Sequence, residues 1–223
     1  MGKTIELTAA DGHKFAAYRA DPTGKPKGAL VVIQEIFGVN GHMRRVTDGF
    51  AAEGYAAIAP ALFDRTRRGV ELGYDADAIA AGRDLRAAVG DSGPLADIQA
   101  TIDEAAKSGD RVGVIGYCWG GTLAYLSATR LKGIAGAVGY YGGGIAAAAA
   151  EKTKVPVMLH FGETDQSIPM SDVEKVRAAH PEIELHVYPA GHGFNCDERG
   201  SYHAPSARTA LDRSLGFLRK HIG

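Results

Sequence analysis

One segment, Arg111-Val-Gly-Val-Ile-Gly-Tyr-Cys-Trp-Gly-Gly-Thr122, constrains the fold of this chain more than any other. Its apolar run from Val112 to Ile115 indicates a buried parallel strand, and a helix is expected from Thr122 to Leu131. Between them the pattern G-x-S-x-G occurs with Cys118 in place of serine. A strand and a helix joined this tightly predict a nucleophile elbow, whose glycines avoid collisions with both elements. A buried cysteine beside an ordinary glycine turn is the alternative.

The elbow would give Cys118 a reactive setting. A sharp strand-to-helix turn lifts the central residue clear of the sheet and strains its backbone. The thiol would then lie at a helix N-terminus, where partial positive charge favours a thiolate. Free backbone N–H groups at the same turn could bind an oxyanion.

The composition fits one enzyme domain that acts on small molecules. With 223 residues, 45% of them hydrophobic, the chain can fill one core, so a single domain over residues 1–223 is expected. A net charge of −1 predicts no binding to nucleic acid or to an anionic membrane. No apolar run approaches the roughly 18 residues of a membrane span, and the N-terminus lacks the apolar core of a signal peptide. We therefore expect a cytoplasmic protein, a monomer or a weak homodimer, without a cofactor.

Strand-like and helix-like segments alternate along the chain, which predicts a mainly parallel, doubly wound α/β sheet with helices on both faces. No internal repeat is visible. The expected elements are a hairpin at 3–8 and 14–19, strands at 29–33, 55–59, 112–115, 134–141, 155–161 and 184–188, and helices at 42–52, 75–89, 95–107, 122–131, 171–180 and 205–220.

Three local patterns predict an exposed segment, the start of one helix and the buried face of another. Residues 62–74 show little periodicity and are expected to form an exposed excursion. Ser171 and Glu174 have the spacing of a capping box, which predicts a helix start at that serine. In the C-terminal helix one face should hold four apolar residues, namely Ala207, Leu211, Leu215 and Leu218.

Four polar side chains each follow a predicted strand. Functional residues of open parallel sheets gather beyond the C-terminal ends of the strands, where Glu35, Cys118, Asp165 and His192 are expected. A cysteine nucleophile needs an acid–base partner, and imidazole serves near neutral pH when a carboxylate orients it. Asp165 could instead be a turn former, and His192 an ordinary loop histidine. Their joint order, nucleophile then Asp then His, is that of the α/β-hydrolase fold.

Five segments resemble the dienelactone hydrolase family, and the likeness runs from about Ala29 to Leu218. The resemblance implies an α/β-hydrolase fold for nearly the whole chain. The segments are Gln34-Glu-Ile-Phe-Gly-Val-Asn40, Gly116-Tyr-Cys-Trp-Gly-Gly121, Gly139-Tyr-Tyr-Gly142, Gly162-Glu-Thr-Asp165 and Ala190-Gly-His-Gly-Phe194.

The same resemblance implies site roles. It makes Cys118 the nucleophile, with Asp165 and His192 as its partners. It implies that Glu35 hydrogen-bonds the resting thiol until substrate displaces the carboxylate. By similarity, the oxyanion would be held by two backbone N–H groups, those of Ile36 and Trp119.

The family's carboxylate-binding arginines have no direct counterpart in this chain. The position four residues after the catalytic histidine is Cys196, and the helical region near residues 79 and 80 lacks arginine. Each of three other arginines is expected to be a solvated surface residue, and the alternative is that one of them supplies the positive charge from elsewhere. The residues that could contact substrate are Arg83, Arg199, Arg65, Phe37 and Tyr141.

Two details bear on the pocket and its thiol. Trp119 stands where many relatives have leucine, so the pocket could be narrower or more aromatic. Cys196 is expected to be a bystander; the alternatives are that it forms an inactivating disulfide with Cys118 or tunes the Cys118 thiol. His160 and His186 are expected to be structural, and no metal-ligand spacing such as H-E-x-x-H occurs.

The sequence thus predicts a cysteine-dependent hydrolase of enol-lactones that works through an acyl-enzyme. A carboxylesterase or thioesterase on the same scaffold is the first alternative, which the unmatched arginines favour. A non-catalytic or redox-sensing thiol protein is the second, and the Glu35, Asp165 and His192 side chains argue against it.

Overall fold

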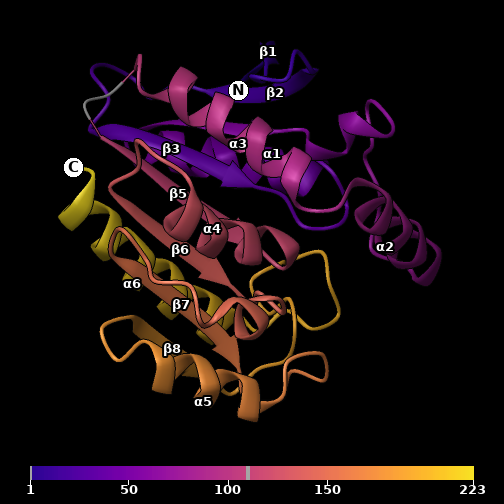
Figure 1. Ribbon diagram of the computed structural model, residues 1–223, viewed down its shortest axis with the longest axis vertical. Helices are drawn as coiled ribbons and strands as arrows, with labels where there is room; N and C mark the ends of the chain where they lie inside the picture. The colour runs from indigo at the N-terminus through magenta and orange to yellow at the C-terminus, as the bar shows by residue number, and fades with distance from the viewer. Residues whose placement is uncertain (1, 109–110) are drawn as a thin grey trace.

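A computed structural model describes residues 2–108 and 111–223 as a layered α/β structure built on one eight-stranded sheet (Figure 1). The strand order is β1-β2-β4-β3-β5-β6-β7-β8. Only the pairs β1–β2 and β2–β4 are antiparallel, so the predicted, mainly parallel sheet is confirmed. The strands are β1 (Lys3–Thr8), β2 (Lys14–Ala20), β3 (Gly28–Ile33), β4 (Tyr55–Pro60), β5 (Val112–Tyr117), β6 (Gly136–Tyr140), β7 (Val157–Gly162) and β8 (Glu184–Tyr188).

Helices cover both faces of the sheet, as predicted. In β6 a Cβ at Gly136 would meet Phe217 of α6, whereas a Cβ at Gly139 would meet Gly121 of α4. Residues three apart in a strand point to opposite faces, so α4 and α6 pack on opposite sides (Figure 1). The helices are α1 (Gly41–Ala52), η1 (Leu62–Arg65), α2 (Ala76–Val89), α3 (Ser92–Ala105), α4 (Trp119–Arg130), η2 (Ile145–Ala148), α5 (Met170–Ala179) and α6 (Ala204–His221).

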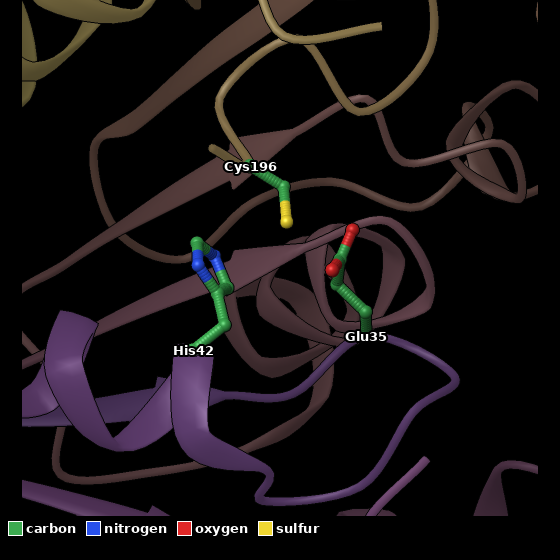
Figure 2. Close-up of side chains that lie close together, drawn as sticks. All are labelled: Glu35, His42 and Cys196. Atoms are coloured by element: carbon green, nitrogen blue, oxygen red, sulfur yellow. The ribbon is translucent and has the colours of Figure 1, made fainter. Parts of the chain in front are cut away.

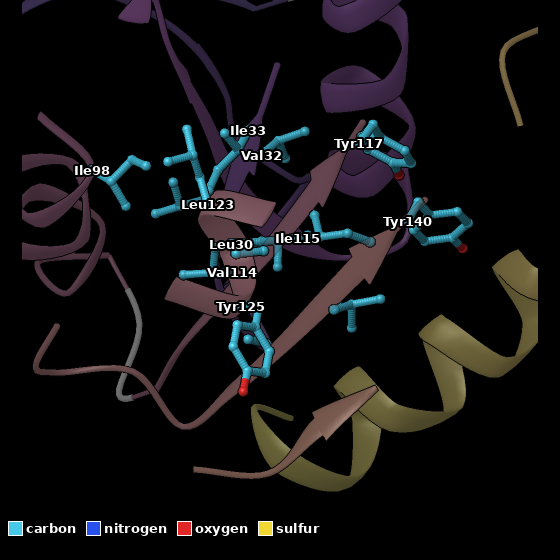
Figure 3. Close-up of a cluster of buried hydrophobic side chains, with 14 of the residues drawn as sticks. Leu30, Val32, Ile33, Ile98, Val114, Ile115, Tyr117, Leu123, Tyr125 and Tyr140 are labelled. Atoms are coloured by element: carbon cyan, nitrogen blue, oxygen red, sulfur yellow. The ribbon is translucent and has the colours of Figure 1, made fainter. Parts of the chain in front are cut away.

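The five central strands are buried along their whole length, which explains their continuous apolar runs. Figure 3 shows side chains of β3 and β5, such as Leu30 and Val114, packed against Leu123 of α4 and Ile98 of α3. This core fixes the carboxyl ends of β3, β5, β7 and β8 at one edge of the sheet. Among the described residues, no helix has both the length and the apolarity needed to cross a membrane.

The predicted exposed excursion at 62–74 was partly wrong. Leu62, Phe63 and Asp64 are buried in η1, and the Phe63 ring stacks on the Trp119 indole with centroids 5.4 Å apart. Four residues are too few to show a helical period, so the sequence pattern gave no sign of this burial.

Helix boundaries differ from the predictions for physical reasons. α3 begins at Ser92 because Pro94, which lacks an N–H, is tolerated in a first turn. α5 begins at Met170 after Pro169 and has no side-chain cap, so the capping box at Ser171 was wrong. On α6, Leu211 is 41% exposed, and the buried face instead includes Phe217.

Candidate active site

The turn after β5 has the backbone of an elbow. Cys118 has φ 55° and ψ −118°, a conformation that costs a non-glycine residue about 1–3 kcal/mol. A Cβ at Gly116 would lie 1.9 Å from the Gly120 carbonyl oxygen, and a Cβ at Gly120 would lie 2.5 Å from that of Gln34. Glycine is therefore required at both positions. The turn places Cys118 directly before Trp119, the first residue of α4.

The structure brings Cys118, His192 and Asp165 together. His192 Nε2 is 3.2 Å from Cys118 Sγ, and its Nδ1 is 2.7 Å from Asp165 Oδ2. The other carboxylate oxygen of Asp165 accepts the backbone N–H groups of Ser167 and Ile168 at 2.8 and 3.2 Å. Because the Asp165 side chain is buried and held by these bonds, it can fix the orientation of the imidazole.

The contacts of His192 favour its charged form. Burial by itself lowers the pKa of this imidazole, but hydrogen bonds to Asp165 and Cys118 outweigh burial and raise the pKa to about 10. The Tyr141 ring packs edge-on against the imidazole with centroids 5.1 Å apart. Beside a Cys118 thiolate and Asp165 the imidazolium is therefore stabilised, and this is the form that results once the imidazole has taken the proton from sulfur.

Glu35 lies just after the end of β3 and is 1% exposed. Burial raises the pKa of its carboxyl group, and the charges of Arg199, His42 and His192 oppose that effect. Oε1 is 3.4 Å from Arg199 Nη1, while Oε2 has no hydrogen-bond partner in the described part of the chain. Within that same part, no hydrogen bond joins Glu35 to Cys118. The link between this carboxylate and the resting thiol therefore stays a prediction.

Two backbone N–H groups are available beside the thiol. In the described residues, neither Ile36 nor Trp119 uses its amide as a hydrogen-bond donor. Helix α2 packs directly against Ile36: a Cβ built at Gly82 would lie only 2.2 Å from the Ile36 carbonyl oxygen. The Trp119 indole donates a hydrogen bond to Asp91 at 3.0 Å, which holds the side chain at the pocket wall.

A cavity of about 380 Å³ opens over the thiol and the imidazole. Apolar side chains and three arginines line it. Arg83 lies there, and Arg86, one helical turn further along α2, was missed although its i,i+3 spacing on the predicted helix was a usable signal. Further lining residues include Ile36, Phe37, Ile79, Trp119, Ile168 and Arg199.

The other predicted substrate contacts divide into three cases. Phe37 lines the cavity, and the Arg199 guanidinium lies 5.7 Å from its ring, so Arg199 is not a solvated surface residue. Arg65 lies elsewhere, with Nη2 2.7 Å from buried Asp97 and Nη1 2.8 Å from Asp11. Tyr141 is 1% exposed and lies behind His192, so it supports the imidazole instead of lining the cavity.

Cys196 is buried next to Glu35, and its thiol is free, as is that of Cys118. Burial, together with the negative charge of Glu35, raises the pKa of Cys196 to about 11. Figure 2 shows this thiol facing the side chains of Glu35 and His42. His160 is also buried and bonds Tyr188 and Ser214, which confirms its structural role.

Comparisons with known proteins show what this chain is similar to. The family model described as "Dienelactone hydrolase family" matches residues 15–222. A Synechocystis sp. protein with the provisional name carboxymethylenebutenolidase is 38% identical, over 90% of this chain and 89% of its own. The carboxymethylenebutenolidase of Pseudomonas putida is 34% identical, over 96% of this chain and 94% of its own.

A solved structure extends the match to the fold. A Klebsiella pneumoniae protein provisionally named dienelactone hydrolase superposes with a TM-score of 0.86 at 32% identity, covering 99% of this chain and 100% of its own. Its α/β-hydrolase architecture corresponds to the sheet described above. This chain therefore belongs to the dienelactone hydrolase family, and with it to the hydrolases of ester bonds.

Proposed function

We propose that the chain hydrolyses an enol-lactone or a similarly activated ester by acyl transfer to Cys118. The position of His192 is the main support for this proposal. Its Nε2 lies 3.2 Å from Cys118 Sγ, and its Nδ1 lies 2.7 Å from Asp165 Oδ2. This arrangement supplies a nucleophile, a base and an orienting carboxylate in one line.

The reaction would run in two halves. His192 takes the thiol proton, and the Cys118 sulfur attacks the ester carbonyl to form a tetrahedral oxyanion. The N–H groups of Ile36 and Trp119 stabilise that oxyanion. Its collapse breaks the bond to the leaving oxygen, which takes the proton from His192. Water then attacks the thioester while His192 removes its proton. The tetrahedral intermediate collapses by breaking the C–S bond, His192 returns the proton to the Cys118 sulfur, and the acid leaves.

Glu35 would couple thiol activation to substrate. Its contact with Arg199 is long, at 3.4 Å, and its carboxyl group is buried, so a carboxylate of the substrate can compete for the guanidinium. Displaced from Arg199, Glu35 would leave its resting position near the thiol, and the Cys118 proton would pass to His192. The thiolate would then form mainly when substrate is bound, as the family resemblance implies.

The cavity favours a substrate that carries a negative charge. Arg83, Arg86 and Arg199 all line it, so positive charge is present although the family's usual positions lack arginine. The name of the Pseudomonas putida relative, carboxymethylenebutenolidase, describes a lactone of this kind for that protein. A carboxylesterase of neutral substrates is the second candidate, because Phe37 and Ile168 give the same cavity apolar walls.

A paired substrate panel tests the proposal and separates the two candidates. Hydrolysis of a carboxylate-bearing dienelactone and of a neutral aryl ester is measured with the wild type and with Cys118→Ala as the blank. We expect Arg83→Gln to lower kcat/KM for the anionic lactone about tenfold and to leave the neutral ester within about twofold. Arg219→Gln, an exposed arginine outside the cavity, is the matched control. A neutral ester that outperforms the lactone in every variant would favour the carboxylesterase.

A further inference from the structure

Three potential metal ligands converge behind the catalytic pocket. They come from the end of β3, from α1 and from the loop after β8, and Figure 2 shows their side chains pointing toward one another. A carboxylate oxygen of Glu35, a ring nitrogen of His42 and the Cys196 sulfur all lie within 4.8 Å of one another. All three residues are buried, with exposures of 1%, 6% and 0%.

Two of the ligands are prepared for coordination. Glu35 Oε2 is a buried oxygen that accepts no hydrogen bond from the described residues, so its lone pairs are unused. His42 Nδ1 is 3.0 Å from Asp197 Oδ1, which leaves Nε2 as the ring nitrogen free to bind a cation. A carboxylate behind a histidine is the usual outer partner of a metal-bound imidazole.

We propose that Glu35, His42 and Cys196 form a binding site for a thiophilic divalent cation such as Zn²⁺. Sulfur, imidazole and carboxylate are the donors that Zn²⁺ selects in proteins, and a tetrahedral site places its ligand atoms roughly 3.5 Å apart. The observed spread, up to 4.8 Å, therefore closes by small side-chain rotations. Three protein ligands leave the fourth position to water or to an exogenous ligand.

The charges of the site balance when it is loaded. On binding, the Cys196 thiol releases its proton to solvent, so one thiolate and one carboxylate neutralise the two charges of the cation. Around them, Asp197 beyond His42 offsets Arg199, whose guanidinium lies 3.4 Å from Glu35 Oε1. The buried complex is then neutral overall, which keeps the cost of its burial low.

Occupation of the site would change Glu35. A bound cation would hold this carboxylate away from Arg199 and from Cys118, and hydrolysis would slow. That consequence rests on the proposed function, whereas the binding itself does not.

Cobalt spectroscopy tests the site directly, because the chain contains only two cysteines. In the Cys118→Ala protein the only thiol left is Cys196, so a thiolate-to-cobalt charge-transfer band on Co²⁺ addition can come from that residue alone. We expect a band of one-to-one stoichiometry that Zn²⁺ abolishes by displacement. Asp197→Asn, which alters a half-exposed residue outside the ligand set, should weaken Co²⁺ binding about tenfold.

Two further variants on the Cys118→Ala background define the ligands. His42→Gln and Glu35→Gln should each weaken binding at least tenfold, with circular dichroism to confirm that the fold is kept. The absence of a charge-transfer band in Cys118→Ala would overturn the proposal. A band that neither of these two variants weakens would also overturn it, since Cys196 alone would then be responsible.

Discussion

At Cys118 a strained backbone and a reactive side chain occur in the same residue. The residue type and its flanking glycines were readable from the sequence, because G-x-S-x-G between a strand and a helix requires this turn. The contact between Arg199 and Glu35 was not readable, because 164 residues separate the two along the chain. The same holds for His42 beside Cys196, which only the folded chain brings together.

The strain at Cys118 predicts an unusual effect of glycine. At φ 55° glycine has no Cβ penalty, so Cys118→Gly should be more stable to unfolding than Cys118→Ala by about 1 kcal/mol. The expected difference is smaller than the full strain, because glycine also makes the unfolded chain more flexible. Urea denaturation of both variants measures the difference. An alanine variant of equal or greater stability would show that the elbow backbone is relaxed.

The buried carboxyl group of Glu35 predicts a pH-dependent stability. Because its folded pKa is raised above 4.5, the folded protein binds the proton more tightly than the unfolded chain does. Wild-type stability should therefore fall relative to Glu35→Gln as the pH rises above about 4.5, and the difference should level off beyond the folded pKa. Denaturant titrations from pH 4 upward, at about half-unit steps, follow the two proteins. A difference that does not change with pH would contradict this prediction.

At the scale of elements, the approach of α2 to the end of β3 positions one side of the site. Strand and helix identities followed from apolar periodicity and are confirmed, including the helix at 75–89. Periodicity could not predict that α2 packs close to Ile36, because this contact depends on Gly82 having no side chain. Helix starts such as that of α5 were also missed, because local capping signals were overridden by the surrounding fold.

Gly82→Ala should therefore lower both activity and stability. The new Cβ would lie 2.2 Å from the Ile36 carbonyl oxygen. Either α2 or the loop after β3 must therefore move, and movement of that loop displaces the Ile36 amide. We expect a loss of about 1–3 kcal/mol in unfolding free energy and at least a tenfold loss of kcat. Gly49→Ala in α1 is the control, since nothing lies within 4 Å of its Cβ, and it should gain about 0.5–1 kcal/mol. Equal stability and equal kcat in the two variants would show that Gly82 does not position the Ile36 amide.

At the scale of the whole molecule, the parallel sheet gathers residues from distant segments at one edge. The order of the polar residues along the chain was enough to predict this meeting, because parallel strands end at the same edge. The distribution of charge was not predictable to the same degree. Arg65 turned inward to Asp97, whereas Arg86 and Arg199 joined Arg83 at the cavity.

This clustered positive charge predicts a salt effect that depends on the substrate. Raising ionic strength from about 0.05 to 0.5 M shortens the Debye length to a few ångströms and weakens long-range attraction. The kcat/KM for an anionic ester should fall several-fold, mainly through KM, while that for a neutral ester stays nearly constant. Equal responses of the two esters would mean that the arginines do not attract the substrate.

Mass spectrometry of an acid-quenched reaction can detect the acyl-enzyme on Cys118. The protein is mixed with a slowly hydrolysed activated ester, and intact mass and peptide mapping follow. We predict one acyl group per chain, on Cys118, none on buried Cys196, and no adduct in Cys118→Ala. His192→Gln should form the adduct much more slowly. Two results would contradict acyl transfer to Cys118. One is full turnover by the wild type with no adduct on Cys118, and the other is undiminished activity in Cys118→Ala.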